Sequence, residues 1–151
     1  MHQHIQTVNI RKHLLATEAL MRALARKFNE DENRWGIAGL LHDLDWDQTK
    51  KEPTKHGLIS YELLKNEDID AEMLNAIKIH NYVLGIAPQT LLEKALYCGE
   101  TMTGFIVAVA LVQPSKKLAD VSVESIMRKW KEKSFAAGAN REIIGLCQEY
   151  L

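Results

Sequence analysis

Apolar side chains recur every three to four positions along most of this chain, a spacing that places them on one face of an α-helix. The first such stretch spans about Val8 to Phe28 and predicts an amphipathic helix. A second helix is predicted through Trp35 and ends near Asp45. Residues with short polar side chains precede it and are candidate N-caps: Asn29, Asp31 and Asn33.

The pattern then breaks and resumes several times. Residues 46–55 are polar, contain Pro53 and predict a loop. A third helix is predicted from His56 to Lys65, and a fourth runs through Met73 and ends around residues 80–82. Gly85 and Pro88 interrupt the chain next.

The longest apolar segment, Leu91 to Val112, predicts a central helix that is buried on most sides. Its β-branched part, FIVAVALV, could instead form a strand, but no partner strand is evident. Two more helices are predicted, at about 123–131 and 140–151. The fold class expected is therefore all-α: one domain over residues 1–151, built as an irregular bundle of about six to seven helices.

Composition and charge narrow the function classes. The chain has 151 residues, 46% of them apolar, and a formal net charge of −1, so no global charge attracts it to nucleic acid or anionic lipid. The apolar run Phe105–Val112 is too short for a membrane helix, and the first residues lack the apolar core of a signal peptide. His2 and His4 are expected in a disordered terminus. We expect a soluble cytoplasmic protein without a membrane partner; the sequence leaves monomer and homodimer open.

Cysteine usage points to the same compartment. Cys98 and Cys147 are too few to form a disulfide framework, which favours a reducing environment. Cys98 is expected to be a small buried apolar residue and not a ligand.

The chemistry is predicted to centre on His42 and Asp43, which close the apolar segment GIAGLLHDLDW. A carboxylate on so apolar a helix costs several kcal/mol to desolvate unless it is paired or binds a cation. Imidazole and carboxylate together suit a transition metal. Other candidate ligands stand next to apolar residues elsewhere in the chain: His13, His56, His80 and Glu100.

This ordered set resembles the HD superfamily of metal-dependent phosphohydrolases. His13, His42-Asp43 and Glu100 match the four-point motif of that family, and His56 and His80 match extra histidines of its two-metal members. The resemblance covers about residues 8–112, with GLLHDLD as its most specific piece, and implies that helices in 115–151 pack on this part. The C-terminal segment is also similar to a bacterial branch of predicted HD hydrolases.

Three positions depart from the family pattern. Glu100 stands where Asp is usual, and His80 is followed by Asn81 where a second histidine is frequent. Trp46 occupies a position that is Glu in some nucleotide-cleaving members, so Asp45 or Asp47 would have to take any such role.

The resemblance implies metal-assisted hydrolysis of a phosphate ester of a small molecule, with a nucleotide as one candidate. The expected cofactor is one or two divalent ions, with iron, manganese, nickel, cobalt and zinc all compatible. Asp43, Asp45 and Asp47 are candidate catalytic residues. Four basic side chains are candidates for binding the substrate phosphate: Lys55, Lys117, Lys133 and Arg141. A solvent-exposed helix face is the alternative explanation for these residues. The alternative function is a non-enzymatic sensor or structural module that keeps the metal site.

Overall fold

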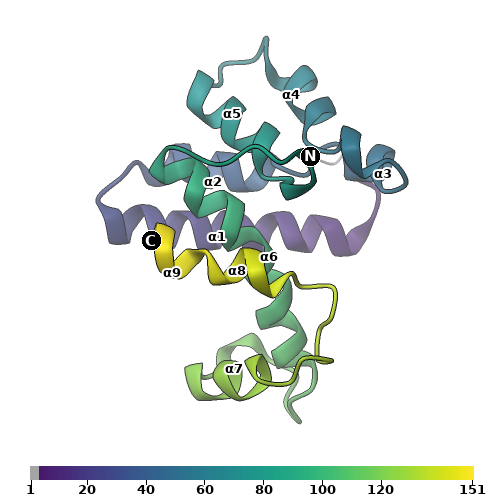
Figure 1. Cartoon of the computed structure of the whole chain (residues 1–151), viewed down its shortest axis with the longest axis vertical. Coiled ribbons are helices and arrows are strands. Elements are labelled where there is room, and N and C mark those ends of the chain that lie inside the picture. Colours follow the sequence, from purple (N-terminus) through teal and green to yellow (C-terminus); the bar gives the residue numbers. More distant parts are fainter. Residues whose placement is uncertain (1–3) are drawn as a thin grey trace.

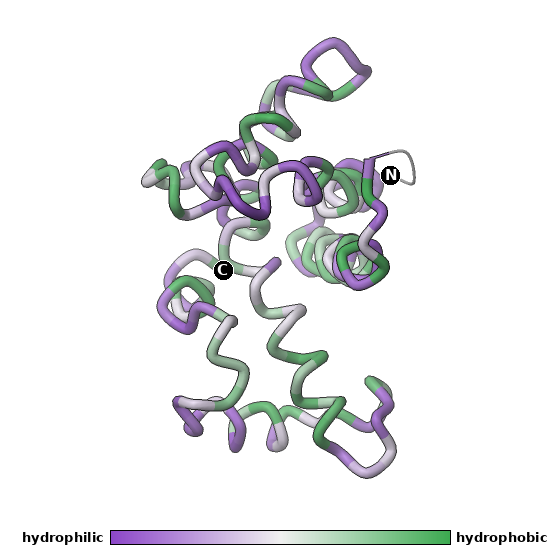
Figure 2. Tube along the Cα trace, turned by 90° about the vertical axis from the view of Figure 1, so that its right-hand side faces the viewer, coloured by the Kyte–Doolittle hydropathy of each residue, from purple (hydrophilic) through white to green (hydrophobic). Residues whose placement is uncertain are grey.

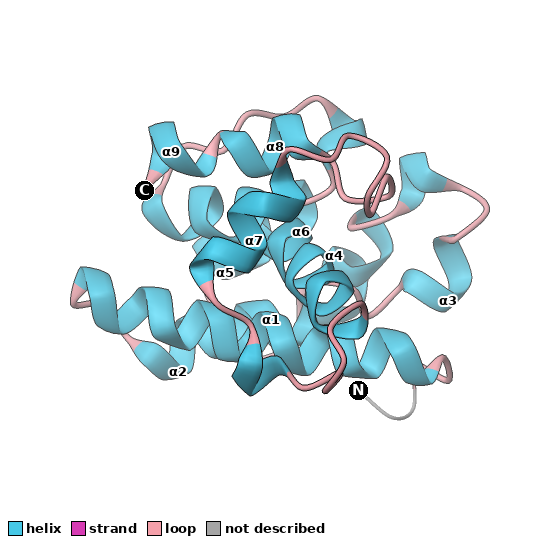
Figure 3. Cartoon of the chain, turned by 90° about the horizontal axis from the view of Figure 1, so that it is seen from below, coloured by secondary structure: helices cyan, strands magenta, loops and turns pink. Residues whose placement is uncertain are grey.

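The computed structural model describes residues 4–151, and within them every regular element is a helix (Figures 1 and 3). His2 lies outside the described residues. Nine α-helices are present there; α3 and α9 are single turns of four residues, so seven remain when these are set aside, in line with the prediction. The α-helices are α1 Val8–Phe28, α2 Glu32–Leu41, α3 Trp46–Thr49, α4 Leu58–Leu64, α5 Ala71–Ile79, α6 Leu91–Leu111, α7 Val123–Trp130, α8 Arg141–Gly145 and α9 Cys147–Tyr150. Three short 3₁₀ helices complete the described part: η1 Pro53–Lys55, η2 Tyr82–Leu84 and η3 Leu118–Asp120.

The helix ends follow capping chemistry that is visible in the sequence. α1 has the predicted bounds, and Asn29 ends it in the left-handed conformation with φ of 59°. Of the candidate caps before α2, Asp31 is the N-cap, and its side chain accepts from the backbone N–H groups of Asn33 and Arg34. Thr90 and Glu93 form a reciprocal capping box at the start of α6.

The predicted loop over residues 46–55 is wrong in part. Trp46–Thr49 forms the helical turn α3 and Pro53–Lys55 forms η1. The prediction failed because four-residue helical turns are too short to show a hydrophobic period.

α6 is the central element, and its FIVAVALV segment is helical. Its N-terminal half packs with α1, α2 and α5 in a core that is completed by a set of buried side chains: Met21, Ala25, Trp35, Ala38, Met73, Ala76, Leu92, Ala95 and Leu96. Its C-terminal half runs on toward α7 at the far end of the molecule (Figure 1). There Phe105 and Val109 pack with Ile144 of α8 in a second cluster. Figure 2 shows how apolar and polar residues alternate along the chain.

α6 is also the helix in the described part of the chain that is long and apolar enough to cross a membrane, with a mean hydropathy of 1.2 in its most apolar window. Half of that window is buried inside the protein. Glu93, in the first turn of α6, is also buried and accepts hydrogen bonds from Asn75, Gln89 and Thr90. These features match a core helix.

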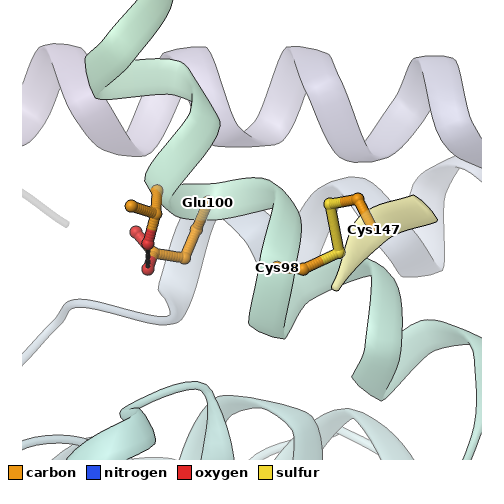
Figure 4. The surroundings of a disulfide bond; sticks show 4 residues. Cys98, Glu100 and Cys147 are labelled. Atoms are coloured by element: carbon orange, nitrogen blue, oxygen red, sulfur yellow. Dashed lines mark hydrogen bonds between the residues drawn. A yellow bond between two sulfur atoms is a disulfide. The ribbon is translucent and has the colours of Figure 1, made fainter. Parts of the chain in front are cut away.

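The sequence predicted no disulfide framework and a reducing environment, but this structure contains one disulfide. Cys98 of α6 and Cys147 of α9 form a disulfide, with their Cα atoms 5.5 Å apart (Figure 4). The bond ties the C-terminal helices to α6 across 49 positions of sequence. Two cysteines far apart in sequence give no spacing motif, so only the packing of α9 against α6 reveals the pair.

Candidate metal centre

Six side chains from five separate parts of the chain converge at one point. His13 lies on α1, His42 is the C-cap of α2 with Asp43 directly after it, and His80 is the C-cap of α5. His56 precedes α4, and Glu100 lies in the middle of α6. The structure therefore brings together all six ligands predicted from the sequence. We call them the His–acid cluster.

Asp43 lies at the middle of the cluster. Its Oδ1 is 3.0 Å from Nε2 of His56, 3.2 Å from Nε2 of His80 and 3.5 Å from Nε2 of His42. Its Oδ2 is 3.7 Å from Nε2 of His13, which is also 3.5 Å from Oε2 of Glu100. One carboxylate thus contacts all four imidazoles.

In each imidazole Nε2 faces Asp43, and Nδ1 lies within hydrogen-bonding distance of another group. Nδ1 of His42 lies 2.8 Å from the carbonyl of Gly39, and Nδ1 of His80 lies 2.6 Å from that of Ile77. Since a carbonyl only accepts, each Nδ1 must carry the hydrogen, and the lone pair is left on Nε2. This is the tautomer that a metal ligand requires.

The other two rings are oriented in the same way. Nδ1 of His56 lies 2.7 Å from Oδ1 of Asp45, and Nδ1 of His13 lies 3.0 Å from Oγ1 of Thr103. The Thr103 hydroxyl donates to the Glu100 carbonyl, so it accepts from His13. Thr103 was not predicted from sequence, although its place three residues after Glu100 puts both on one helix face.

The Nε2 atoms form close pairs that a cation, or a proton shared between two rings, would stabilise. Those of His13 and His42 are 3.2 Å apart, and those of His56 and His80 are 3.1 Å apart. In neutral rings with hydrogen on Nδ1, each pair would point lone pairs at each other. Two overlapping groups have ligand atoms all within 4.8 Å of one another and could hold a metal ion: His13, His42 and Glu100, and His42, Asp43 and His80.

The neighbouring imidazoles keep the two acids of the cluster ionised although both are buried. Burial opposes charge on Asp43 and Glu100, but the neighbouring imidazoles lower the pKa of both carboxyl groups, that of Asp43 to well below its usual value. Full burial lowers the pKa of His42 to about 4, so that ring is neutral at pH 7. Burial opposes charge on His56 too, yet hydrogen bonds to Asp43 and Asp45 raise its pKa to about 9. The cluster without metal therefore holds a proton that a cation would displace.

Asp45 is a positioning residue in this structure. Its side chain is fully buried, and its Oδ2 accepts from the backbone N–H groups of Gly57 at 2.8 Å and Ser60 at 2.9 Å. Together with the bond to His56, these contacts occupy the carboxylate. The predicted catalytic role of Asp45 is therefore replaced by one in orienting His56.

Gly57 makes this arrangement possible, and replacing it should damage both the fold and the cluster. Its φ is +83°, and a Cβ there would lie 2.5 Å from the carbonyl oxygen of Lys78. We expect Gly57→Ala to lower the free energy of unfolding by about 3 kcal/mol and to displace His56. Gly85 also has a positive φ, +67°, but open space around it, so Gly85→Ala is the control and should cost about 1 kcal/mol. Urea unfolding measures both, and equal losses would contradict the clash.

Asp47 points away from the cluster. Its carboxylate accepts from the backbone N–H of Gln6 at 2.7 Å and of Thr7 at 3.0 Å, at the start of α1. Three N–H and O–H donors lower the pKa of Asp47. Its position corrects the predicted catalytic role, because the carboxylate fixes the N-terminus of α1 instead.

The four basic candidates for substrate binding are not gathered at the cluster. The Lys55 ammonium is exposed and pairs with Glu52 at 2.5 Å, and Lys117 and Lys133 are exposed. Arg141 donates to the carbonyls of Glu132 and Phe135. Its guanidinium also lies over the rings of Phe105 and Trp130, which gives it a structural role.

An open cleft lies above the cluster and has two lobes. The Trp46 lobe, about 370 Å³, is lined by cluster residues together with Ile10, Trp46, Pro53, Asn81, Tyr82 and Val83. The Gly104 lobe, about 420 Å³, is lined by His13 and Glu100 together with Tyr82, Thr101, Gly104, Ala136, Gly138, Ala139 and Asn140. His13, Glu100 and Tyr82 border both lobes. The lobes were not predicted, since residues 136–140 reach the cleft only through the packing of α8.

Comparison with known proteins gives one match. Neither the curated proteins nor the solved structures that were compared include a significant match. The family model described as "HD domain" matches residues 10–103, which include all six cluster residues. Members of this family are typically metal-dependent hydrolases. With helices, histidines and acids in the family's order, this chain belongs to the HD-domain family.

Proposed function

We propose that this protein is a metal-dependent phosphohydrolase that cleaves a phosphate ester of a small molecule. The observation that carries the proposal is the convergence of four correctly oriented imidazoles and two ionised carboxylates at the floor of an open cleft. A purely structural cluster would gain nothing from that opening. The net charge of −1 argues against a large nucleic-acid substrate.

Each cluster residue receives a role from its position. His13, His42 and Glu100 would hold one ion; Asp43 would bridge to a second, held by His56 and His80. Mixed imidazole and carboxylate ligation suits iron, manganese, nickel, cobalt or zinc. Once bound, such an ion lowers the pKa of a coordinated water and polarises a phosphoryl oxygen.

The remaining residues prepare the site. Asp45 and Thr103 hold His56 and His13 in the ligating tautomer. His42 has no exposed surface, so it lies beneath the floor of the cleft and cannot contact the substrate directly. The substrate must therefore approach from the side of His13, Glu100 and the two lobes.

Replacing Thr103 tests whether the hydrogen bond to Nδ1 of His13 supports metal binding. We expect Thr103→Val to weaken metal binding about 10- to 100-fold, because the His13 ring loses the acceptor that fixes its tautomer. Thr103→Ser keeps the hydroxyl and should bind metal nearly as the wild type does. Isothermal titration with Zn²⁺ or Mn²⁺ measures both, and equal affinity of the valine and serine variants would remove Thr103 from the site.

The function itself is tested by metal analysis and an ester screen. Elemental mass spectrometry should find a divalent metal in the purified protein. Activity on phosphomonoesters, nucleotides or cyclic nucleotides should be lost when a chelator is added and restored when metal is added back. Bound metal without turnover on any of these classes would favour the alternative, a sensor module. Protein that neither contains nor binds a metal would refute both the phosphohydrolase and the metal-binding sensor module.

A further inference from the structure

The two lobes of the cleft carry no formal charge outside the His–acid cluster. Among the described residues that line them, the only titratable side chains besides Tyr82 are members of the cluster. No lysine or arginine is among them. Phosphate groups that are not held by a metal ion need such side chains, or further backbone donors, to compensate their charge.

The basic side chains Lys12, Lys116 and Arg141 line neighbouring cavities and not the two lobes. Lys12 and Lys116 line a groove along α1 and α6 that also contains Thr103, on the Nδ1 side of His13. That side is turned away from the cluster, because Nε2 of His13 is the atom that faces Asp43 and Glu100. Arg141 is engaged by carbonyl groups and aromatic rings, as described above.

The Trp46 lobe is instead apolar and aromatic. Ile10, Pro53 and Val83 line it, and Val83 is 47% exposed. Trp46 meets the His56 ring edge-on at 5.3 Å, which leaves the indole beside the cluster. Flat, uncharged groups pack well against such walls.

From this chemistry we propose that the substrate carries a single phosphate, held at the cluster, and an uncharged flat apolar group that lies in the Trp46 lobe. This inference rests on the proposed function and narrows its substrate class. It disfavours substrates with a chain of phosphates or with a second anionic group at the far end.

Binding of three phosphonates, whose C–P bond is not hydrolysed, tests the class in metal-loaded protein. By isothermal titration, benzylphosphonate should bind at least about tenfold more tightly than methylphosphonate, because only the ring buries apolar surface. 4-Carboxybenzylphosphonate has the same ring and a second anionic group at its far end, so it should bind about tenfold more weakly than benzylphosphonate. Equal affinity for the benzyl and methyl compounds would overturn the inference, and so would tighter binding of the carboxylated one.

A charge introduced into the lobe provides the matched test. Val83→Lys should reverse the preference, so that 4-carboxybenzylphosphonate binds more tightly than benzylphosphonate. Val112→Lys adds the same charge at an exposed valine outside both lobes and should leave the wild-type order unchanged. Reversal in both variants, or in neither, would place the ring outside the Trp46 lobe.

Hydrolysis of the matching esters separates this inference from the proposed function. Benzyl phosphate and methyl phosphate have leaving alcohols of similar acidity, so a higher kcat/KM for the benzyl ester reports the ring and supports both proposals. Tight binding of benzylphosphonate with no ester hydrolysed would support the ligand class and refute the phosphohydrolase. Hydrolysis of both esters at equal kcat/KM would retain the phosphohydrolase and refute the ligand class.

Discussion

Asp43→Ala is expected to reduce the hydrolysis of phosphate esters at least about 1000-fold and to release metal from the protein. Asp43 Oδ1 lies within 3.5 Å of three imidazole nitrogens, and its Oδ2 lies 3.7 Å from Nε2 of His13. Removal of a shared carboxylate takes a ligand from both candidate metal positions and leaves the buried rings without their counter-charge. Helix content should stay nearly unchanged, because the apolar faces of the helices dominate folding.

Three measurements check this result: metal per protein, kcat/KM on the best ester of the screen, and far-UV circular dichroism. Asp43→Asn preserves shape without charge and should resemble the alanine variant in activity. Asp120→Ala removes an exposed acid in η3 and should behave like wild type. Loss of helix content in Asp43→Ala would show that the cluster is chiefly structural, and retained metal with full activity would refute its role altogether.

Reduction of the Cys98–Cys147 disulfide is expected to lower the free energy of unfolding by about 4 kcal/mol. The bond closes a loop across 49 positions, and a loop of that length loses about this much chain entropy when it is cross-linked in the unfolded state. In a chain of this size the melting temperature should fall by roughly 10 °C. Metal binding should persist, because Glu100 projects from another side of α6 than the disulfide does (Figure 4).

Thermal unfolding with and without a phosphine reductant, which does not compete for metal as thiols do, measures the effect. Cys147→Ser is the control. It should melt at the temperature of the reduced wild type, and the reductant should not change its melting temperature. A thiol titration that finds two free cysteines in air-oxidised, unfolded protein would contradict the bond. A melting temperature that is equal in all four samples would show that it contributes no stability.

The sequence by itself determined the helical class, the bounds of α1 and α6 and the identity of the six cluster residues. Hydrophobic spacing is a local property, so α1 was predicted at its observed bounds. The cluster was found because a buried His-Asp pair is costly without a partner and because the ordered set resembles a known family. Thr103 could have been found by the same helical spacing from Glu100, since residues three apart share a helix face.

Only the tertiary structure decided what surrounds those residues. Asp45 and Asp47 are separated by one residue, yet one orients His56 and the other fixes the start of α1. Cys98 meets Cys147, and Arg141 turns to the carbonyls of its own loop. Each outcome depends on where a side chain points after distant helices have packed, and no local period or spacing encodes that direction. The long helices could therefore be predicted from the sequence, but the walls of the cleft could not.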